Sequence, residues 1–161
     1  MLGKDYTQLL EITASFNVEN NPGRSSRFCI REKNTGKYVG FIKLGSPVLN
    51  IKPRNNYFGV SKTPLDLANK HFVNGFNIVP AQPFGYNCLG GKLLALYCCS
   101  HELREFLNEK YDKMEALFFE TTSLYGSIKN VSQYDGLKPF LRHSGDTESK
   151  LLLKFLFPLG L

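Results

Sequence analysis

The spacing of the apolar residues changes abruptly in the middle of the chain, and this change is the strongest constraint on the fold. Residues 72–80, FVNGFNIVP, predict a strand that ends at Pro80, because proline cannot donate a hydrogen bond to a neighbouring strand. From Leu89 to Leu107 the apolar residues recur at helical spacing, which predicts the longest helix of the chain. The apolar run in residues 115–123, EALFFETTS, then predicts a buried strand.

Two glycines and a lysine, Gly90, Gly91 and Lys92, stand where this helix begins, in the stretch YNCLGGKLL. Glycine lets another group approach the backbone closely, and the free N–H groups at a helix start attract anions such as phosphate. Alternatively, the glycines only allow the helix to pack closely on a sheet, and Lys92 is a solvated lysine of the first turn. Both interpretations are open at this point.

The remaining segments predict two more helices, two hairpins and loops. The first hairpin turns at Asn34-Thr35-Gly36, which has the composition of a tight turn. We expect a helix over 4–16, the first hairpin over 27–44, a loop region over 45–70 with a short strand near 57–60, a short helix over 127–137, and a second hairpin in the apolar tail after residue 140.

Length and composition point to a globular chain. It has 161 residues, of which 42% are apolar and 21% charged, a balance that can bury a core. We therefore predict an α/β (α+β) fold with a mixed, mainly antiparallel sheet flanked by helices. We predict one domain over 1–161, in which 1–26 form an N-terminal helix and loop and 27–157 form the core.

The positive charge is concentrated in the first half of the chain. Residues 1–80 hold 11 Lys and Arg against 5 Asp and Glu, whereas residues 81–161 hold 9 against 9. A one-sided basic surface favours a polyanionic partner such as nucleic acid. The alternative is an ordinary basic domain with solvated side chains. The candidate nucleic-acid contacts are Arg24, Arg27, Arg31, Lys52 and Arg54.

Cysteine and histidine show no metal pattern. Cys29, Cys88, Cys98 and Cys99 lack metal-ligand spacing, and the three histidines are scattered, so we expect no metal. We expect a reducing, cytoplasmic location without a signal peptide. The C-terminal apolar run LLLKFLFPLGL is too short to span a bilayer, so we expect no membrane partner. The same run could dock on a protein partner.

The order of the elements resembles that of the GCN5-related N-acetyltransferase family. The hairpin GKYVGFIKLG is similar to two adjacent strands of that family, and NIVPAQPFGYNCLGGKLLAL resembles its acyl-CoA signature, in which a strand ending in V-x-P leads to a glycine-rich helix start. The segment KNVSQYDGLKPF resembles a later family motif, with Asn130 and Tyr134 in similar places.

A closer likeness is to DruA-like and Mom-like acyltransferase-fold proteins of phages and mobile elements. In these proteins a short N-L-A-S segment opens the helix, a later strand carries E-T, and an aromatic-x-x-L segment follows. The stretches similar to them here are Cys88-Leu89-Gly90-Gly91, Glu120-Thr121 and Tyr134-Asp135-Gly136-Leu137.

The resemblance implies an N-acyltransferase-like protein that uses acetyl-CoA or another acyl-CoA, is encoded by a phage or mobile element, and acts on or near nucleic acid. It implies Tyr134 as the general acid and Glu120 as the base or as a substrate-positioning residue. Because a buried carboxylate needs a partner or a use, Glu120 is informative, unless it lies at a strand end in water. The implied cofactor contacts are Val79, Tyr86, Asn87, Cys88, Leu89, Gly90, Gly91, Lys92 and Asn130.

The sequence departs from the acyl-CoA signature at three positions. Tyr86 stands where Gln or Arg is usual, and Asn87 and Leu89 stand where glycines are usual. These departures support a second interpretation, in which the same fold is a non-catalytic module that binds DNA or inhibits a host factor and has a degenerate cofactor site.

Overall fold

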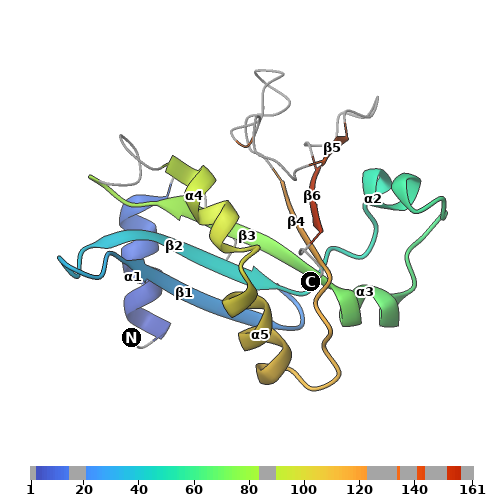
Figure 1. Cartoon of the computed structure of the whole chain (residues 1–161), viewed down its shortest axis with the longest axis horizontal. Helices are drawn as coiled ribbons and strands as arrows, with labels where there is room; N and C mark the ends of the chain where they lie inside the picture. The colour runs from blue at the N-terminus through green and yellow to red at the C-terminus, as the bar shows by residue number, and fades with distance from the viewer. Residues whose placement is uncertain are drawn as a thin grey trace.

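The computed structural model describes residues 3–14, 21–83, 90–122, 134, 141–143 and 152–156. Its helices are interleaved with the strands of one sheet (Figure 1). The elements in chain order are α1 (Gly3–Thr13), β1 (Ser25–Arg31), β2 (Tyr38–Gly45), α2 (Lys52–Tyr57), α3 (Leu65–His71), β3 (Phe72–Pro80), α4 (Gly90–Tyr97), α5 (His101–Lys110), β4 (Phe118–Thr122), β5 (Leu141–His143) and β6 (Leu152–Leu156).

The sheet has six strands in the order β1-β2-β3-β4-β6-β5. The β3 and β4 strands pair in parallel, and every other neighbouring pair is antiparallel. The prediction of an α+β fold with a mixed, mainly antiparallel sheet is therefore confirmed. The first hairpin, the strand over 72–80 and the hairpin in the tail are also confirmed, as are a helix near the N-terminus and a strand within 115–123.

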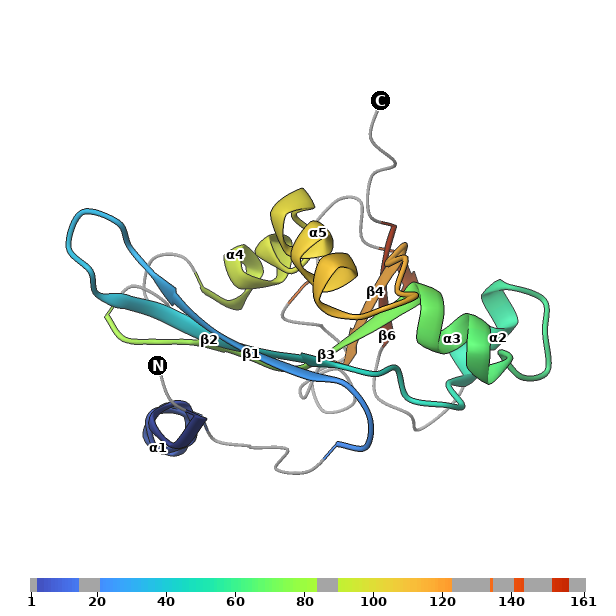
Figure 2. The ribbon, with the colours of Figure 1, turned by 90° about the horizontal axis from the view of Figure 1, so that it is seen from below.

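Helices cover both faces of the sheet. Figure 2 shows α4 and α5 on one face and α1 on the other. The helices α2 and α3 lie at the end of the sheet where β3 begins. The larger core lies under α4 and α5 and includes Ile42, Leu44, Leu94, Leu107 and Phe119. A smaller cluster packs Tyr6 and Leu10 of α1 on Phe41 and Ala81.

The close packing of α4 on the sheet depends on Gly40 of β2. A Cβ atom at this position would lie 2.4 Å from Leu94 Cδ1 and 2.6 Å from the carbonyl oxygen of Val79. Because the second contact is with backbone, a side chain at residue 40 could not be relieved by a rotamer change. The glycine therefore sets the distance between helix and sheet.

The strand predicted near 57–60 is wrong, because α2 ends at Tyr57 and a turn follows at Phe58 and Gly59. The loop predicted over the rest of 45–70 is also wrong in part, because this region contains α2 and most of α3. Pro53 lies in the first turn of α2, where its missing N–H costs nothing. The ring of Phe58, just after α2, packs edge-on against the rings of Phe72 and Phe118. Tertiary contacts of this kind hold a helix that has only six residues.

The single long helix predicted from Leu89 is wrong in its continuity, because it is divided into α4 and α5. Ser100 has extended backbone angles and caps α5, and its hydroxyl accepts a hydrogen bond from the Leu103 N–H at 3.3 Å. The break changes which side of α4 is buried. Leu94 and Ala95 are buried, whereas Leu93 and Leu96 of the predicted apolar stripe are 42% and 40% exposed.

The C-terminal apolar run contributes a strand to the interior of the sheet. β6 pairs with β4 on one side and with β5 on the other. The helix predicted over 127–137 lies outside the described residues, except for Tyr134. Among the helices that the structure describes, none is long and apolar enough to cross a membrane.

Candidate functional site

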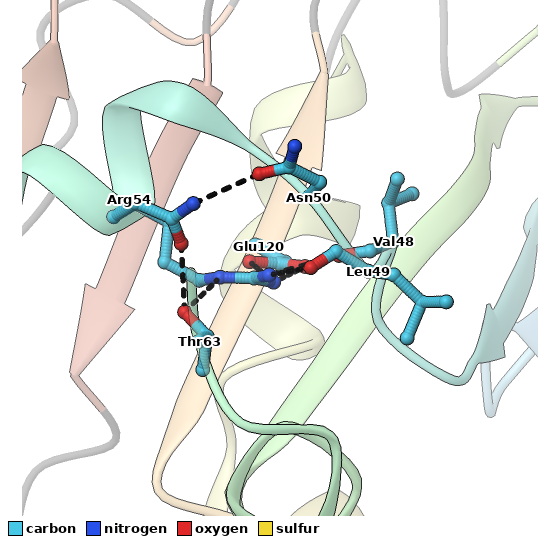
Figure 3. A network of polar contacts seen from close by, with 7 residues as sticks. Val48, Leu49, Asn50, Arg54, Thr63 and Glu120 are labelled. Atoms are coloured by element: carbon cyan, nitrogen blue, oxygen red, sulfur yellow. Dashed lines mark hydrogen bonds and ion pairs between the residues drawn. The ribbon is translucent and has the colours of Figure 1, made fainter. Parts of the chain in front are cut away.

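A buried ion pair joins α2 to β4. The guanidinium Nη1 of Arg54 donates to both carboxylate oxygens of Glu120, at 2.9 Å and 3.1 Å. Arg54 is 0% exposed and Glu120 is 1% exposed (Figure 3). The expectation that Glu120 could sit at a strand end in water is therefore wrong. Because both side chains are buried, water does not screen their attraction. The contribution of the pair to stability therefore depends on how well its hydrogen bonds are aligned.

The same guanidinium also binds the chain that leads into α2. Its Nη2 donates to the carbonyl oxygens of Val48 and Leu49, at 2.9 Å and 3.0 Å, and its Nε donates to Thr63 Oγ1 at 3.2 Å. The guanidinium also stacks over the ring of Phe72, with 5.1 Å between its carbon and the ring centroid. One side chain thus fixes both ends of the 48–63 segment against the sheet (Figure 3).

Amide and hydroxyl groups extend this network. Thr63 Oγ1 donates to Asn55 Oδ1 at 2.8 Å, and Asn55 Nδ2 donates to Asn50 Oδ1 at 2.9 Å and to the Ser61 carbonyl oxygen at 3.1 Å. Asn55 and Thr63 are buried. A buried polar network in which the members bond one another rigidifies the segment that carries it. We call Asn50, Arg54, Asn55, Thr63 and Glu120 the α2 clamp.

The burial of Arg54 corrects one predicted nucleic-acid contact. Its guanidinium is enclosed by the clamp and cannot reach a phosphate on the surface. The structure places the other four candidates on or near several different elements. Arg27 and Arg31 are exposed on β1, Lys52 is exposed on α2, and Arg24 is half-buried beside the ring of Tyr111.

The start of α4 brings together two of the predicted site residues. Gly90 has a φ of +59°, a left-handed conformation that favours glycine. At Gly91 an ideal Cβ would lie 3.9 Å from Cε1 of Tyr134, so the tyrosine ring flanks the helix start. Tyr134 is 2% exposed and belongs to the larger core. Lys92 is exposed in the first turn of α4.

The other predicted cofactor contacts are either on β3 or outside the described residues. Val79 lies opposite Phe41 of β2 and packs against the α1 cluster. The predicted contacts Tyr86, Asn87, Cys88, Leu89 and Asn130 lie outside the described residues.

The parallel strands β3 and β4 pair over a short distance only. Their register runs from Phe72 opposite Phe118 to Gly75 opposite Thr121. At the last pair, Thr121 Oγ1 donates to the Gly75 carbonyl oxygen at 2.9 Å. β3 then continues to Pro80 alongside β2, and Figure 1 shows β4 turning away from it. The two strands therefore diverge toward the end of β3 that leads to α4.

The predicted acid and base lie on different faces of β4. Phe119 points into the larger core, where Tyr134 is also packed. Side chains alternate along a strand, so Glu120 points to the opposite face, toward Arg54. The structure thus pairs Tyr134 with the start of α4 and Glu120 with the α2 clamp.

Sequence reasoning missed a row of buried polar side chains near Glu120. Lys43, Asn74 and Asn77 are 3%, 5% and 3% exposed. Lys43 lies opposite Asn77 in the β2–β3 register, and Asn74 lies opposite Glu120 in the β3–β4 register. In the sequence, Lys43 stands between the core residues Ile42 and Leu44. A strand with one face in water has the same alternating pattern. The sequence therefore carries no signal that this face is covered.

The part of the chain that the structure describes contains no set of side chains suited to bind a metal ion. No three His, Cys, Asp or Glu side chains are grouped there in a way that could hold an ion. Burial raises the pKa of the Cys98 and Cys99 thiols, which disfavours the reactive thiolate.

These features define an α+β protein with a mixed sheet, a glycine-rich start of the helix α4 that packs on β3, and a buried arginine–carboxylate clamp. The family model described as "Druantia protein DruA" matches residues 5–139, so the chain belongs to the DruA family. The predicted likeness to DruA-like proteins is confirmed. The matched range includes the α2 clamp, the start of α4 and Tyr134.

A curated relative agrees with this assignment. The chain is 27% identical over 157 residues to Druantia protein DruA of Escherichia coli (strain UMEA 4076-1), an alignment that covers 89% of this chain and 38% of the relative. The chain thus spans less than half the length of that relative. No solved structure matches the chain.

Proposed function

We propose that this chain is an acyl-CoA-dependent N-acyltransferase-like protein of the acetyltransferase fold type that acts on or near nucleic acid. The observation that carries this proposal is the start of α4, where Gly90 and Gly91 lie beside Tyr134, in a helix that packs on β3. The single parallel pair in an otherwise antiparallel sheet supports the fold type.

The residues at the start of α4 fit an anionic group. Gly91 has no side chain, so a phosphate could approach the first N–H groups of the helix, which carry partial positive charge. The left-handed φ of Gly90 turns the backbone sharply into the helix. In the proposed site this turn holds the pyrophosphate of the cofactor, as the acyl-CoA signature implies.

The chemistry is a transfer between two groups that the protein binds. A bound acyl-CoA supplies an activated acyl group as a thioester. In the proposal, attack by an acceptor amine would form the amide bond and break the carbon–sulfur bond, and Tyr134 Oη would donate its proton to the departing sulfur. The proton lost by the attacking nitrogen would pass to solvent water, from which Tyr134 would be reprotonated. Arg54 donates to both carboxylate oxygens of Glu120. We therefore propose that Glu120 positions α2 against β4 through the α2 clamp and does not abstract a proton.

One observation favours a second candidate. A carboxylate held by a buried arginine is a poor free base, and Glu120 lies on the other face of β4 from Tyr134. A binding module that keeps the fold without catalysis, and that binds DNA or a host factor, would show the same arrangement. The two candidates differ in whether the α4 start binds acyl-CoA and whether acyl transfer follows.

Thermal unfolding with and without acetyl-CoA tests the proposed site. A ligand at about 100 times its dissociation constant stabilises the native state by about 2.7 kcal/mol, so Tm should rise with ligand concentration. Gly91→Asp should abolish the shift, because its carboxylate repels phosphate while favouring the helix start. Asn56→Asp adds the same charge on exposed α2 and is the matched control. No shift in the wild type at millimolar acetyl-CoA would overturn the acyl-CoA site.

A further inference from the structure

The tip of the β1–β2 hairpin, residues 31–38, is a firmly bonded turn. The Glu32 N–H donates to the Lys37 carbonyl oxygen, and the Gly36 N–H donates to the Glu32 carbonyl oxygen, both at 2.9 Å. Gly36 has a φ of +68°, and a Cβ placed there would meet nothing within 4 Å. Figure 2 shows this tip extending beyond the helices that cover the sheet.

The one acidic side chain of the tip is bonded to the turn itself. The carboxylate of Glu32 accepts hydrogen bonds from the N–H groups of Asn34 and Thr35, at 2.8 Å and 2.6 Å. These bonds hold the pKa of Glu32 below its ordinary value. The carboxylate thus supports the turn.

Three cations surround this turn and are exposed: Arg31, Lys33 and Lys37. None of them makes an ion pair with a residue that the structure describes. The Arg31 guanidinium stacks on the ring of Tyr38, with 4.4 Å to the ring centroid, and donates to its hydroxyl. Stacking limits the conformations of the guanidinium.

We infer that this hairpin tip enters the major groove of duplex DNA and places Arg31, Lys33 and Lys37 against the phosphates. A two-stranded β-ribbon fits the major groove of B-form DNA, which is about 12 Å wide. The major groove of duplex RNA is too deep and narrow for side chains to read. The observations therefore favour DNA as the partner.

The hairpin tip lies at the same end of the sheet as the start of α4. The Ala81 N–H, just after β3, donates to the Val39 carbonyl oxygen at 2.8 Å, next to the first residue of β2. Leu94 of α4 packs over Gly40. A duplex held by the tip would thus lie at the end of the molecule that carries the proposed acyl-CoA site. The inference deepens the nucleic-acid part of the proposed function.

Fluorescence anisotropy with a labelled mixed-sequence DNA duplex longer than two helical turns tests this inference, over about 50 to 200 mM salt. The double variant Lys33→Gln/Lys37→Gln should lower affinity by roughly 10- to 30-fold and reduce the slope of log K against log salt by about 2. The double variant Lys62→Gln/Lys113→Gln removes the same charge from exposed positions outside the hairpin tip. This control pair should change affinity less than about 3-fold.

Three outcomes would overturn the inference. The first is a wild-type protein that does not bind the DNA duplex at low salt. The second is a control pair that weakens binding as much as the tip pair. The third is a duplex RNA of the same sequence that binds as tightly as DNA and whose affinity falls by the same factor in the tip pair. The acetyl-CoA shift in Tm should be unchanged in the tip pair. Failure of DNA binding and failure of the acyl-CoA site are therefore separate results.

Discussion

At the scale of single residues, the most informative feature is a charge that the protein has removed from water. Glu120 lies in an apolar strand, and burying a carboxylate without a partner costs several kcal/mol. That partner is Arg54, which lies 66 positions away in the sequence. Its Nη2 also donates to two main-chain carbonyl oxygens. Each of the two charges thus offsets the desolvation cost of burying the other.

We expect Arg54→Met to lower the free energy of unfolding by about 3–5 kcal/mol, because the carboxylate of Glu120 stays buried without its arginine. The double variant Arg54→Met/Glu120→Leu should recover part of this loss, since it no longer buries an unpaired charge, but the carbonyl oxygens of Val48 and Leu49 still lack their donor. Urea denaturation measures both. A loss below about 1 kcal/mol in the single variant would mean that the pair behaves like a surface pair.

Glu32 should make the hairpin tip sensitive to acid. Its folded-state pKa is lowered, chiefly by the hydrogen bond from the Asn34 N–H, so the unfolded chain binds its proton more readily. Its stabilising effect is therefore present above the unfolded-state pKa and is lost as pH falls through the folded-state pKa.

We expect the amide resonances of Asn34 and Thr35 to titrate with a common midpoint below 4.5, the ordinary value for this carboxyl. NMR spectra recorded through the acid range measure this midpoint. Glu32→Gln should abolish the titration. A midpoint at or above 4.5 would mean that the bonds to the turn do not hold the carboxylate.

At the scale of elements, local chemistry decides some boundaries and tertiary contacts decide others. The hairpin and β3 follow from turn residues, alternation and proline, all of which act within a few positions. The break between α4 and α5 had a local signal in Ser100, since serine is a favoured N-cap and Glu102 lies in the following turn. The helical spacing on both sides of Ser100 obscured it.

The two glycines at the start of α4 should respond differently to alanine. Gly90→Ala should cost about 1–2 kcal/mol, because its φ of +59° is strained for a residue with a Cβ. Gly91→Ala places its Cβ at an ordinary contact distance of 3.9 Å from Tyr134, so stability should be unchanged or rise by up to about 1 kcal/mol through the higher helix propensity of alanine.

Thermal and urea unfolding of the two variants measure this difference. Equal losses at both positions would contradict the role assigned to the left-handed turn at Gly90. If Gly91→Ala also leaves the fold intact by circular dichroism, it can be used to examine ligand binding without loss of structure.

At the scale of the whole molecule, the sheet order brings distant segments together in ways that no local pattern states. The predicted element order led to the α+β class and to a mixed sheet, because strand and helix periods are readable along the chain. The sequence did not reveal the partner of Glu120, the burial of the face that holds Lys43, or the two short helices α2 and α3. Each depends on contacts between segments far apart in the sequence.

The same scale decides how the predicted site is divided. Gly91 and Tyr134, 43 positions apart, lie side by side, whereas Glu120 points to the other face of β4. Family membership covers all three residues but states no role for any of them. The proposed function therefore depends on whether the α4 start binds the cofactor.

A crystal structure of the protein grown with coenzyme A tests this most directly. We expect density for the pyrophosphate on the first N–H groups of α4, beside Gly90 and Gly91, with the rest of the molecule running between the diverging ends of β3 and β4. Crystals with a fully accessible α4 start but no such density, or coenzyme A bound at another place only, would contradict the proposed function.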